Sequence, residues 1–289
     1  MKIQKPFLTQ SSVLIIGMAR SGTTLVSHIL GSLPGVHMEV EPHALWKSGN
    51  FNYLNDEEFE STDKIISNIR TKLYNRAVEK VLIEKSPNNT LHPALVHKVF
   101  PEAKIVYIER DPVRCIHSNY KRSLTQDSFK LSIILKKYFV YTGSKDLDGA
   151  ISNFKLYNQI STSDWPDFLR YTIHMFSLRK KNLLPFGPKL KDFENIVKDK
   201  GLLAYHTEVY KKTEIYKDIY KQLYGSNLEF FSLEKIMNDM NEIKRLVDFT
   251  GIPVDEDWFN SIRKTFDSDR VKKSQAKSDI EEEIRELIK

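Results

Sequence analysis

The stretch Val13-Leu-Ile-Ile-Gly-Met-Ala-Arg-Ser-Gly-Thr-Thr24 decides the fold of this chain of 289 residues. It begins with an uninterrupted apolar run that ends at Gly17, which is typical of a strand buried on both faces of a sheet. A turn that contains glycine follows, and from Thr24 to Leu33 the apolar side chains recur at helical spacing. The stretch therefore predicts a strand, a turn and a helix in direct succession.

The same order of elements recurs further along the chain. Val81–Glu84 is expected to form a short strand, and Thr90–Phe100 a helix. Lys104–Arg110 is expected to form the next strand, and Pro112 suits the first turn of a helix after it. Strands that alternate with helices favour a parallel sheet that is covered on both sides. The prediction is an α/β fold of three layers, with a central parallel sheet flanked by helices.

The second half of the chain is less regular. Residues 129–224 are mostly helical in pattern and rich in aromatic side chains. The later elements expected are a strand, one or two helices closed by a glycine and a proline, and a charged terminal helix (Leu228–Phe231, Leu233–Thr250 with Gly251 and Pro253, Asp279–Ile288). The sequence has no internal repeat and no linker of low complexity. We therefore expect a single domain over residues 1–289, with a helical insertion at about 126–225.

Composition and charge argue against several classes of protein. The contents of 40% hydrophobic and 28% charged residues are ordinary for a globular protein, and no segment approaches the roughly 20 consecutive apolar residues of a membrane helix. The single cysteine, Cys115, excludes an internal disulfide framework, so the cytoplasm is the expected location. The net charge of +6 suits a polyanionic ligand, but the dense basic stripe of a nucleic-acid-binding protein is missing. No histidine or cysteine cluster has the spacing of a metal site.

The turn between the first strand and the first helix has the form of a phosphate-binding loop. Gly17 and Gly22 have the spacing of the P-loop of nucleoside triphosphatases, in which backbone N–H groups at a helix start cradle a phosphate. Thr23 replaces the P-loop lysine, which argues against transfer of a terminal phosphoryl group, and Arg20 supplies a cation instead. An ordinary tight turn is the alternative, but the order of strand, turn and helix favours phosphate binding and a P-loop-type fold.

Arg20-Ser-Gly-Thr-Thr24 resembles the loop that binds the 5′-phosphosulfate in the sulfotransferases, whose donor is 3′-phosphoadenosine 5′-phosphosulfate (PAPS). Ala19 stands where that family usually has a proline. The resemblance implies that the loop holds the 5′-phosphate and the sulfate of PAPS without a metal, and that the product is 3′-phosphoadenosine 5′-phosphate (PAP). The donor-binding residues implied here are Arg20, Ser21, Gly22, Thr23 and Thr24, and Arg20 is also a catalytic candidate.

A second segment, Tyr107-Ile-Glu-Arg-Asp-Pro-Val-Arg114, resembles the part of the same family that binds the 3′-phosphate. The resemblance implies that Arg110, at a strand end, and Ser118, one helical stretch later, clamp this group. An arginine fork with a hydroxyl is a suitable receptor for a phosphate dianion. The alternatives are a salt bridge at the strand end for Arg110 and a solvated hydroxyl for Ser118. Arg114 is equally suited to a surface role.

Sulfuryl transfer needs a base for the proton of the acceptor hydroxyl and cations for the charge on the bridging oxygen of the donor. Within His37-Met-Glu-Val-Glu-Pro-His43, Glu41 falls where the tyrosylprotein sulfotransferases and similar bacterial enzymes carry their catalytic glutamate. The resemblance therefore implies that Glu41 is the base. Glu39 and His43 are alternative bases, and an acidic loop without a catalytic role is a further possibility.

Two more segments resemble parts of the family's active site. Lys85, in Glu84-Lys-Ser-Pro87, resembles the lysine of a Lys-x-Pro element that contacts the sulfate or the bridging oxygen, and a surface lysine is the alternative. Late segments like residues 266–271 close over the donor in the family. The resemblance thus implies that Ser268 and Arg270 contact the sulfate and the 3′-phosphate.

The rest of the chain departs from the family's pattern. Leu233 stands where a tyrosine is common, and the stretch from Gln126 to Gly225 matches no motif, so it is expected to shape the acceptor pocket. Within it, the aromatic stripe from Trp165 to Phe176 is expected to belong to the core rather than to the wall of a binding site.

The expected activity is transfer of a sulfuryl group from PAPS to a hydroxyl on a sugar, peptide, lipid or small metabolite, by motifs shared with tyrosylprotein and carbohydrate sulfotransferases. One alternative is a P-loop nucleotide kinase or hydrolase in which Thr24 binds Mg²⁺. Another is an inactive relative that only binds the nucleotide. Dependence on a metal would reveal the first, and an unchanged function after substitution of Glu41 or Lys85 would reveal the second.

Overall fold

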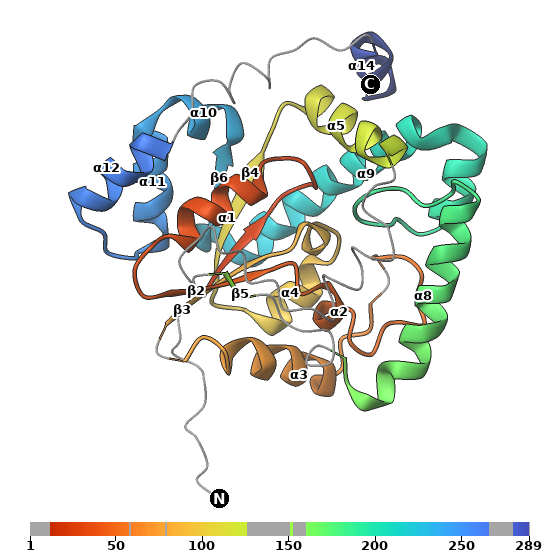
Figure 1. Ribbon diagram of the computed structural model, residues 1–289, viewed down its shortest axis with the longest axis horizontal. Helices are drawn as coiled ribbons and strands as arrows, with labels where there is room; N and C mark the ends of the chain where they lie inside the picture. The colour runs from red at the N-terminus through yellow and green to blue at the C-terminus, as the bar shows by residue number, and fades with distance from the viewer. Residues whose placement is uncertain are drawn as a thin grey trace, which may run out of the picture.

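The computed structural model describes residues 12–57, 59–78, 80–125, 151–152, 160–265 and 280–288 (Figure 1). Ser268 and Arg270 lie outside these residues. Six parallel strands form one sheet in the order β5-β2-β3-β1-β4-β6. The strands are β1 (Ser12–Ile16), β2 (Val36–Val40), β3 (Val81–Lys85), β4 (Lys104–Glu109), β5 (Ile151–Ser152) and β6 (Leu228–Ser232). The predicted α/β fold with a central parallel sheet is confirmed.

Helices flank the sheet on both sides (Figure 1). The α-helices are α1 (Thr23–Gly31), α2 (His43–Trp46), α3 (Asp63–Tyr74), α4 (Pro93–Val99), α5 (Pro112–Thr125), α8 (Trp165–Lys180), α9 (Phe193–Tyr224), α10 (Leu233–Asn238), α11 (Met240–Thr250), α12 (Glu256–Thr265) and α14 (Glu281–Ile288). Short 3-10 helices are η1 (Pro87–Leu91), η3 (Thr162–Asp164) and η4 (Gly225–Asn227).

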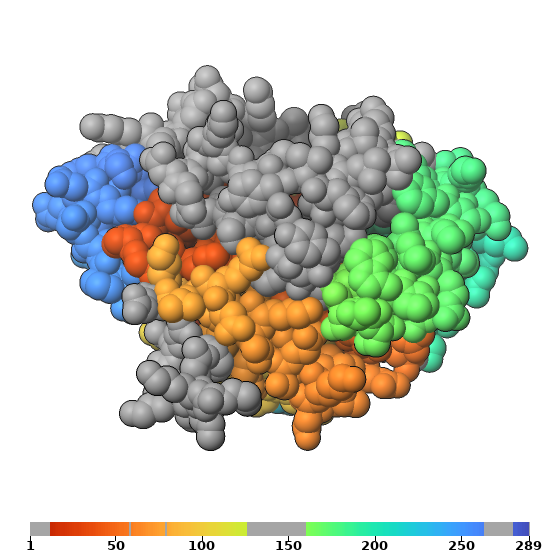
Figure 2. All heavy atoms as spheres, turned by 60° about the horizontal axis from the view of Figure 1, so that its bottom comes forward, coloured from red at the N-terminus to blue at the C-terminus, as the bar shows by residue number. Residues whose placement is uncertain are grey.

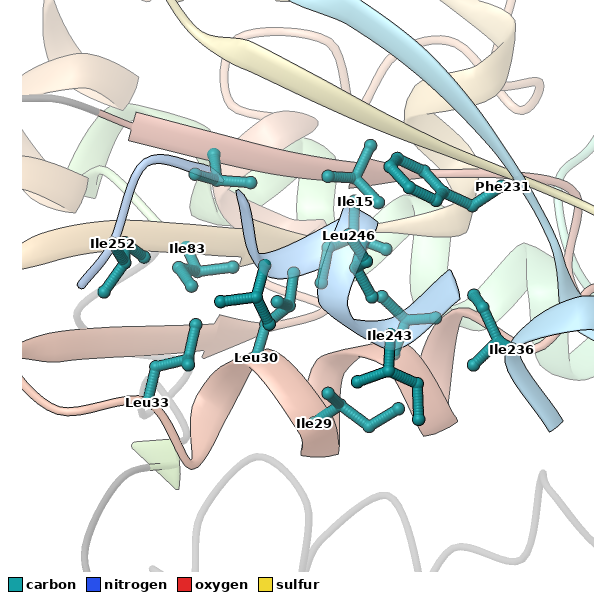
Figure 3. Packing of buried hydrophobic residues seen from close by; sticks show 14 of the residues in the cluster. Ile15, Ile29, Leu30, Leu33, Ile83, Phe231, Ile236, Ile243, Leu246 and Ile252 are labelled. Carbon is teal, nitrogen blue, oxygen red and sulfur yellow. The ribbon is translucent and has the colours of Figure 1, made fainter. Parts of the chain in front are cut away.

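The two faces of the sheet bury separate hydrophobic clusters, because successive side chains of a strand point to opposite faces. Val13 and Ile15 pack with α1, α10 and α11, in the cluster shown in Figure 3. Leu14 and Ile16 pack with α3, α4 and α9 on the other face. All four side chains are at most 1% exposed. The continuous apolar run of β1 follows from this double burial, since neither face of the strand contacts water.

Strand β2 was not predicted from the sequence, where an acidic loop was one possibility for the residues after the first helix. It pairs with β3 along its whole length. Because β2 contains polar residues, its sequence does not show the apolar pattern of a buried strand. In the structure, however, Glu39 is fully buried and its Oε1 lies 2.7 Å from His37 Nε2. A buried polar pair inside a strand removes the apolar pattern from which a strand is recognised.

The helix expected at Thr90–Phe100 begins later than predicted. Residues up to Leu91 belong to η1, and α4 starts at Pro93. His92, between them, has φ of −135° and ψ of 60°. A residue before a proline is disfavoured in the helical region, so Pro93 separates the two elements.

The last described helix returns to the body of the fold. Helix α14 lies against α5 (Figure 1), and its Ile284 is fully buried with Val113 and Ile116 of α5. The prediction of a charged terminal helix is confirmed, and so is the closure of α11 by Gly251, which has φ of +74°. Within the described part of the chain, no helix combines the length and the hydropathy needed to cross a membrane.

Candidate active site at the carboxyl ends of the strands

The loop of residues 17–22 joins β1 to α1 in a path that requires glycine at two positions. A Cβ atom at Gly17 would lie 2.6 Å from the carbonyl oxygen of Ile108. Gly22 has φ of +104°, and a Cβ atom there would lie 2.4 Å from Leu233 Cδ1. The first N–H groups of α1 have no partner within the helix. The loop thus leads to a helix N-terminus with the partial positive charge that favours an anion.

Arg20, Arg110 and Ser118 come together from three elements. Arg20 Nε donates to Ser118 Oγ at 3.1 Å, and Arg110 Nη1 donates to the carbonyl oxygen of Arg20 at 2.8 Å. The pKa of Arg20 is lowered by burial first, and then by the positive charges of Arg110 and Arg122. Cations held this close repel one another, so a bound anion would stabilise the arrangement.

Helix α5 fixes the loop through a residue that the sequence did not single out. Asn119 Nδ2 donates to the carbonyl oxygen of Ala19 at 2.6 Å, and Cys115 Sγ donates to the same oxygen at 3.4 Å. Ser21 Oγ is buried and has no hydrogen-bond partner among the described residues. An orphaned buried hydroxyl costs about 1–3 kcal/mol, and a ligand in the loop would supply the missing partner. In the sequence, the position of Asn119 directly after Ser118 was the signal that could have identified this residue.

Lys85 and Glu41 form a pair beside the loop. Lys85 is 1% exposed, and its Nζ lies 2.6 Å from Glu41 Oε1 and 3.5 Å from Thr24 Oγ1. The pair follows from the register of the sheet, because Val40 is opposite Lys85 and the N–H of Glu41 donates to the carbonyl oxygen of Lys85 at 2.7 Å. Lys85 is therefore buried at the end of β3, not solvated on the surface.

Glu41 has a left-handed backbone conformation, with φ of +54°. Such a conformation costs a residue other than glycine about 1–3 kcal/mol, and it is found mainly at functional sites. Glu41 Oε2 lies 3.4 Å from His43 Nε2, so the carboxylate contacts both Lys85 and His43. Glu39, by contrast, is paired with His37 within β2. Of the three candidate bases, the geometry favours Glu41.

A buried carboxyl next to Lys85 was not considered from the sequence. Glu84 accepts hydrogen bonds from Trp46 Nε1 at 3.0 Å, Ser86 Oγ at 2.5 Å and Asn89 Nδ2 at 3.2 Å. Burial raises its pKa to about 7, against which the bonds from Ser86 and Trp46 act. These bonds tie α2 and η1 to the end of β3, so Glu84 holds the segments that carry the candidate catalytic residues. A glutamate in an apolar strand was the signal for it.

The aromatic stripe of α8 is divided between core and surface. Met175 is buried in a core cluster. Phe168 and Tyr171 pack edge-on against Phe51, with ring centroids 5.3 and 6.0 Å away. Figure 2 shows α8, in green, against the orange segment that contains residues 50–75.

Arg114 donates its backbone N–H to Asp111 Oδ1 at 2.8 Å. No group of three metal-ligating side chains is present in the described ranges.

The chain is similar to several known proteins. A family model described as the sulfotransferase family matches residues 12–145. An uncharacterised protein of Aquifex aeolicus (strain VF5) is 29% identical over 128 residues, covering 38% of this chain, which thus spans only 17% of that relative's length. The sulfotransferase domain from the curacin biosynthetic pathway is 12% identical, with a TM-score of 0.51 and 96% of both chains covered. Mouse sulfotransferase SULT7A1 complexed with PAP is 14% identical, with a TM-score of 0.43 and coverage of 93% of this chain and 68% of that chain.

The family match and the fold agree. The matched residues contain the glycine loop, Glu41, Lys85, Arg110 and Ser118. The fold over the whole described chain is that of the curacin sulfotransferase domain. The match to the sulfotransferase family thus covers residues 12–145, which contain the candidate site, and the described fold is similar to that of a sulfotransferase domain.

Proposed function

We propose that the protein transfers a sulfuryl group from PAPS to a hydroxyl acceptor, with Glu41 as the base. The observation that carries this proposal is the meeting of Glu41, Lys85 and Thr24 at a loop lined with arginine. The Glu41 carboxylate and the Thr24 hydroxyl both lie within 3.5 Å of Lys85 Nζ. Transfer to a hydroxyl needs these groups, since the carboxylate takes a proton and the others stabilise negative charge.

The residues present fit a donor with phosphates at two places. The loop of Arg20 to Thr24 has an orphaned hydroxyl at Ser21 and the N-terminus of α1, both suited to a 5′-phosphosulfate. Arg110 and Ser118 adjoin Arg20 and are suited to a 3′-phosphate. Ser268 and Arg270 remain predictions for the same site, since they lie outside the described residues.

Each side chain has a separate role in the proposed reaction. The bound donor supplies the sulfuryl group and leaves as PAP. Glu41 accepts the proton of the acceptor hydroxyl on a carboxylate oxygen, which raises the electron density on the attacking oxygen. Lys85 holds that carboxylate in place before the reaction through the contact at 2.6 Å, and its ammonium group stabilises charge on the bridging oxygen. Arg20, in the loop, also stabilises negative charge on the bridging oxygen.

A titration with PAP tests the donor half of this proposal. We expect calorimetry to show metal-independent binding that depends on the 3′-phosphate, with adenosine 5′-phosphate, ATP and GTP binding at least about tenfold more weakly, the increment of one charged hydrogen bond. Arg110→Ala should weaken PAP binding by about 1.5–3 kcal/mol, because it removes a charged hydrogen-bond donor. Arg170→Ala is the control, since the Arg170 side chain is 78% exposed on α8.

A nucleotide kinase or hydrolase would give the opposite result in this titration. Preference for ATP or GTP that requires Mg²⁺ would point to phosphoryl transfer, in which Thr24 binds the metal, and would refute the sulfotransferase proposal. Binding of PAP without sulfuryl transfer to any acceptor, in both the wild type and Glu41→Ala, would instead support a relative that only binds the nucleotide.

A further inference from the structure

A cavity of about 80 Å³ lies directly behind His43, between α2, the segment of residues 51–59, η1 and α8. His43 joins the cavity to the candidate active site, because its Nε2 contacts Glu41 and its ring lines the cavity. The walls are aromatic rings from Phe51, Phe59, Phe168 and Tyr171. Any acceptor whose hydroxyl reaches Glu41 past His43 has this cavity beside it.

His92 is the unexplained residue of the cavity. It is 6% exposed, and neither ring nitrogen has a hydrogen-bond partner in another described residue. Its ring stacks on Phe59 with the centroids 4.8 Å apart, which leaves the edge of the ring as the polar surface. Burial lowers the pKa of His92 to about 4, so at neutral pH one nitrogen donates a hydrogen bond and the other accepts. Hydrogen-bonding capacity that is left unmet in a buried ring is costly without a ligand or water.

The charged groups of the cavity are already paired with one another. Lys47 Nζ donates to the carbonyl oxygen of Asn55 at 2.7 Å and lies 3.4 Å from Asp56 Oδ1. Asp56 Oδ2 accepts from Asn88 Nδ2 at 3.2 Å and from the N–H of Lys189 at 2.9 Å. The unmet hydrogen-bonding capacity therefore lies on the ring nitrogens of His92 and on the buried Nδ1 of His43.

Size and polarity together limit what the cavity can hold. It is about half the 150 Å³ of an apolar protein cavity that binds benzene. A sugar ring would bury several hydroxyls against aromatic walls that offer few partners, at a cost for each unmet bond. The edge of a planar ring with one uncharged polar group fits both the walls and one ring nitrogen of His92.

We propose that His92 is a specificity-determining residue that binds a second, uncharged hydroxyl of an aromatic acceptor, while the first hydroxyl lies at Glu41. The inference rests on the proposed sulfuryl transfer, because the first hydroxyl is defined by that reaction. It commits to aromatic diols as the acceptor class. Ordered water is the other occupant that the polar end of the cavity could take.

Binding of simple phenols tests this inference without turnover. Phenol, catechol, resorcinol and hydroquinone are titrated into the protein by calorimetry, with and without PAP. We expect at least one diol to bind about 3- to 10-fold more tightly than phenol, the increment of one hydrogen bond. His92→Phe should abolish this ratio while it keeps the ring that packs on Phe59. His97→Phe, which replaces a histidine of α4 outside this cavity, should keep the ratio.

Nitrogen NMR of the histidine rings provides a second readout, since it reports the hydrogen bonds of His92 directly. The bound diol should shift both ring nitrogens of His92, and phenol should not. Equal binding of phenol and all diols, a ratio that survives in His92→Phe, or ring signals that no diol changes would each overturn the inference and leave water as the partner. Failure of PAP to bind, with the diol ratio intact, would refute the proposed function alone.

Discussion

Glu41 combines a left-handed backbone with two polar contacts, and this combination is the main functional signal at the scale of single residues. The left-handed backbone places the carboxylate between Lys85 and His43, and the contacts with both side chains hold this conformation. Neither the strain nor the contact with Lys85 can be recognised in the sequence, where Glu41 differs from Glu39 only by its position in a motif. Because the chain turns directly after the end of β2, Glu41 rather than Glu39 is the side chain that enters the site.

Replacement of the proposed base should affect turnover and leave donor binding intact. We expect Glu41→Gln to lower the rate of transfer of radiolabelled sulfate from PAPS to the best acceptor of the phenol panel by about 10²- to 10⁴-fold, the usual contribution of a general base. The PAP dissociation constant should stay within about threefold, because the substituted amide keeps an oxygen near Lys85 and the donor contacts are unchanged. The exposed Glu102→Gln serves as the control. A rate that falls less than about tenfold would remove Glu41 from the proposed role.

The buried Glu84 should make stability depend on pH. Burial raises its pKa from 4.5 to about 7, so the folded protein holds the proton more tightly than the unfolded chain does. Its favourable contribution is therefore complete below pH 4.5 and is lost as the pH rises through 7. Glu84→Gln removes this dependence. Relative to the variant, the wild type should lose on the order of 3 kcal/mol of unfolding free energy between pH 4.5 and about 8.

Urea unfolding at several pH values measures the difference. The exposed Glu282→Gln should follow the wild type at every pH, since this residue is solvated on α14. Parallel curves for the wild type and Glu84→Gln would mean that the carboxyl is ionised in the folded protein, and they would contradict the expected sign.

At the scale of elements, the glycine loop depends on neighbours that come from distant parts of the chain. Its carbonyl at Ala19 is held by α5, and its last glycine lies under Leu233, the first residue of α10. Leu233 stands where the family commonly has a tyrosine. The loop is thus fixed between two elements that each follow the carboxyl end of a strand, β4 and β6.

Gly22→Ala should disturb this loop in two ways. The residue would have to keep φ of +104°, which costs about 1–3 kcal/mol, and its Cβ would meet Leu233 Cδ1 at 2.4 Å. We expect weaker PAP binding and an unfolding free energy lower by about 2–4 kcal/mol, measured by calorimetry and urea unfolding. Gly35 has φ of +69° and would meet no atom within 4 Å, so for Gly35→Ala only the conformational cost of about 1–2 kcal/mol applies.

A double-mutant cycle with Leu233→Ala isolates the contact from the conformational cost. The two substitutions should show a favourable coupling energy of about 1 kcal/mol or more, because the smaller side chain makes room for the new methyl group. Strict additivity would mean that Leu233 does not limit the loop.

At the scale of the whole molecule, the candidate site depends on the docking of a helix from the other end of the chain. Helix α14 packs on α5, which carries Ser118 and Asn119. Ile284 forms the centre of this contact. The last described helix therefore supports the element that holds both the glycine loop and the proposed 3′-phosphate site.

Ile284→Ala should destabilise the protein by about 2–4 kcal/mol, because it leaves a cavity against Val113 and Ile116. Thermal unfolding measures the loss. Arg285→Ala, at a side chain that is 60% exposed, should change the unfolding free energy by less than about 0.5 kcal/mol. An equally small effect of Ile284→Ala would show that α14 docks only loosely.

The sequence by itself determined the layered α/β fold and the positions of β1, β3, β4 and β6 along the chain, because a strand buried on both faces is mainly apolar, as Val13 to Ile16 of β1 are. It also identified the loop, Arg110, Lys85 and Glu41 as candidates, since these belong to short local motifs. Only the tertiary structure decided which of these side chains meet. The register of β2 on β3 brings Glu41 to Lys85, and the packing of α5 on the loop brings Ser118 to Arg20.

The cavity behind His43 also comes from tertiary structure alone. Its walls come from α2, residues 51–59, η1 and α8, which are far apart in the sequence, and no local pattern relates them. His92 is, in the sequence, one polar residue before a proline, but the fold buries its ring without a hydrogen bond to any other described residue. Local interactions determine which elements form, whereas burial, register and electrostatics depend on contacts between distant residues and appear only when the chain is folded.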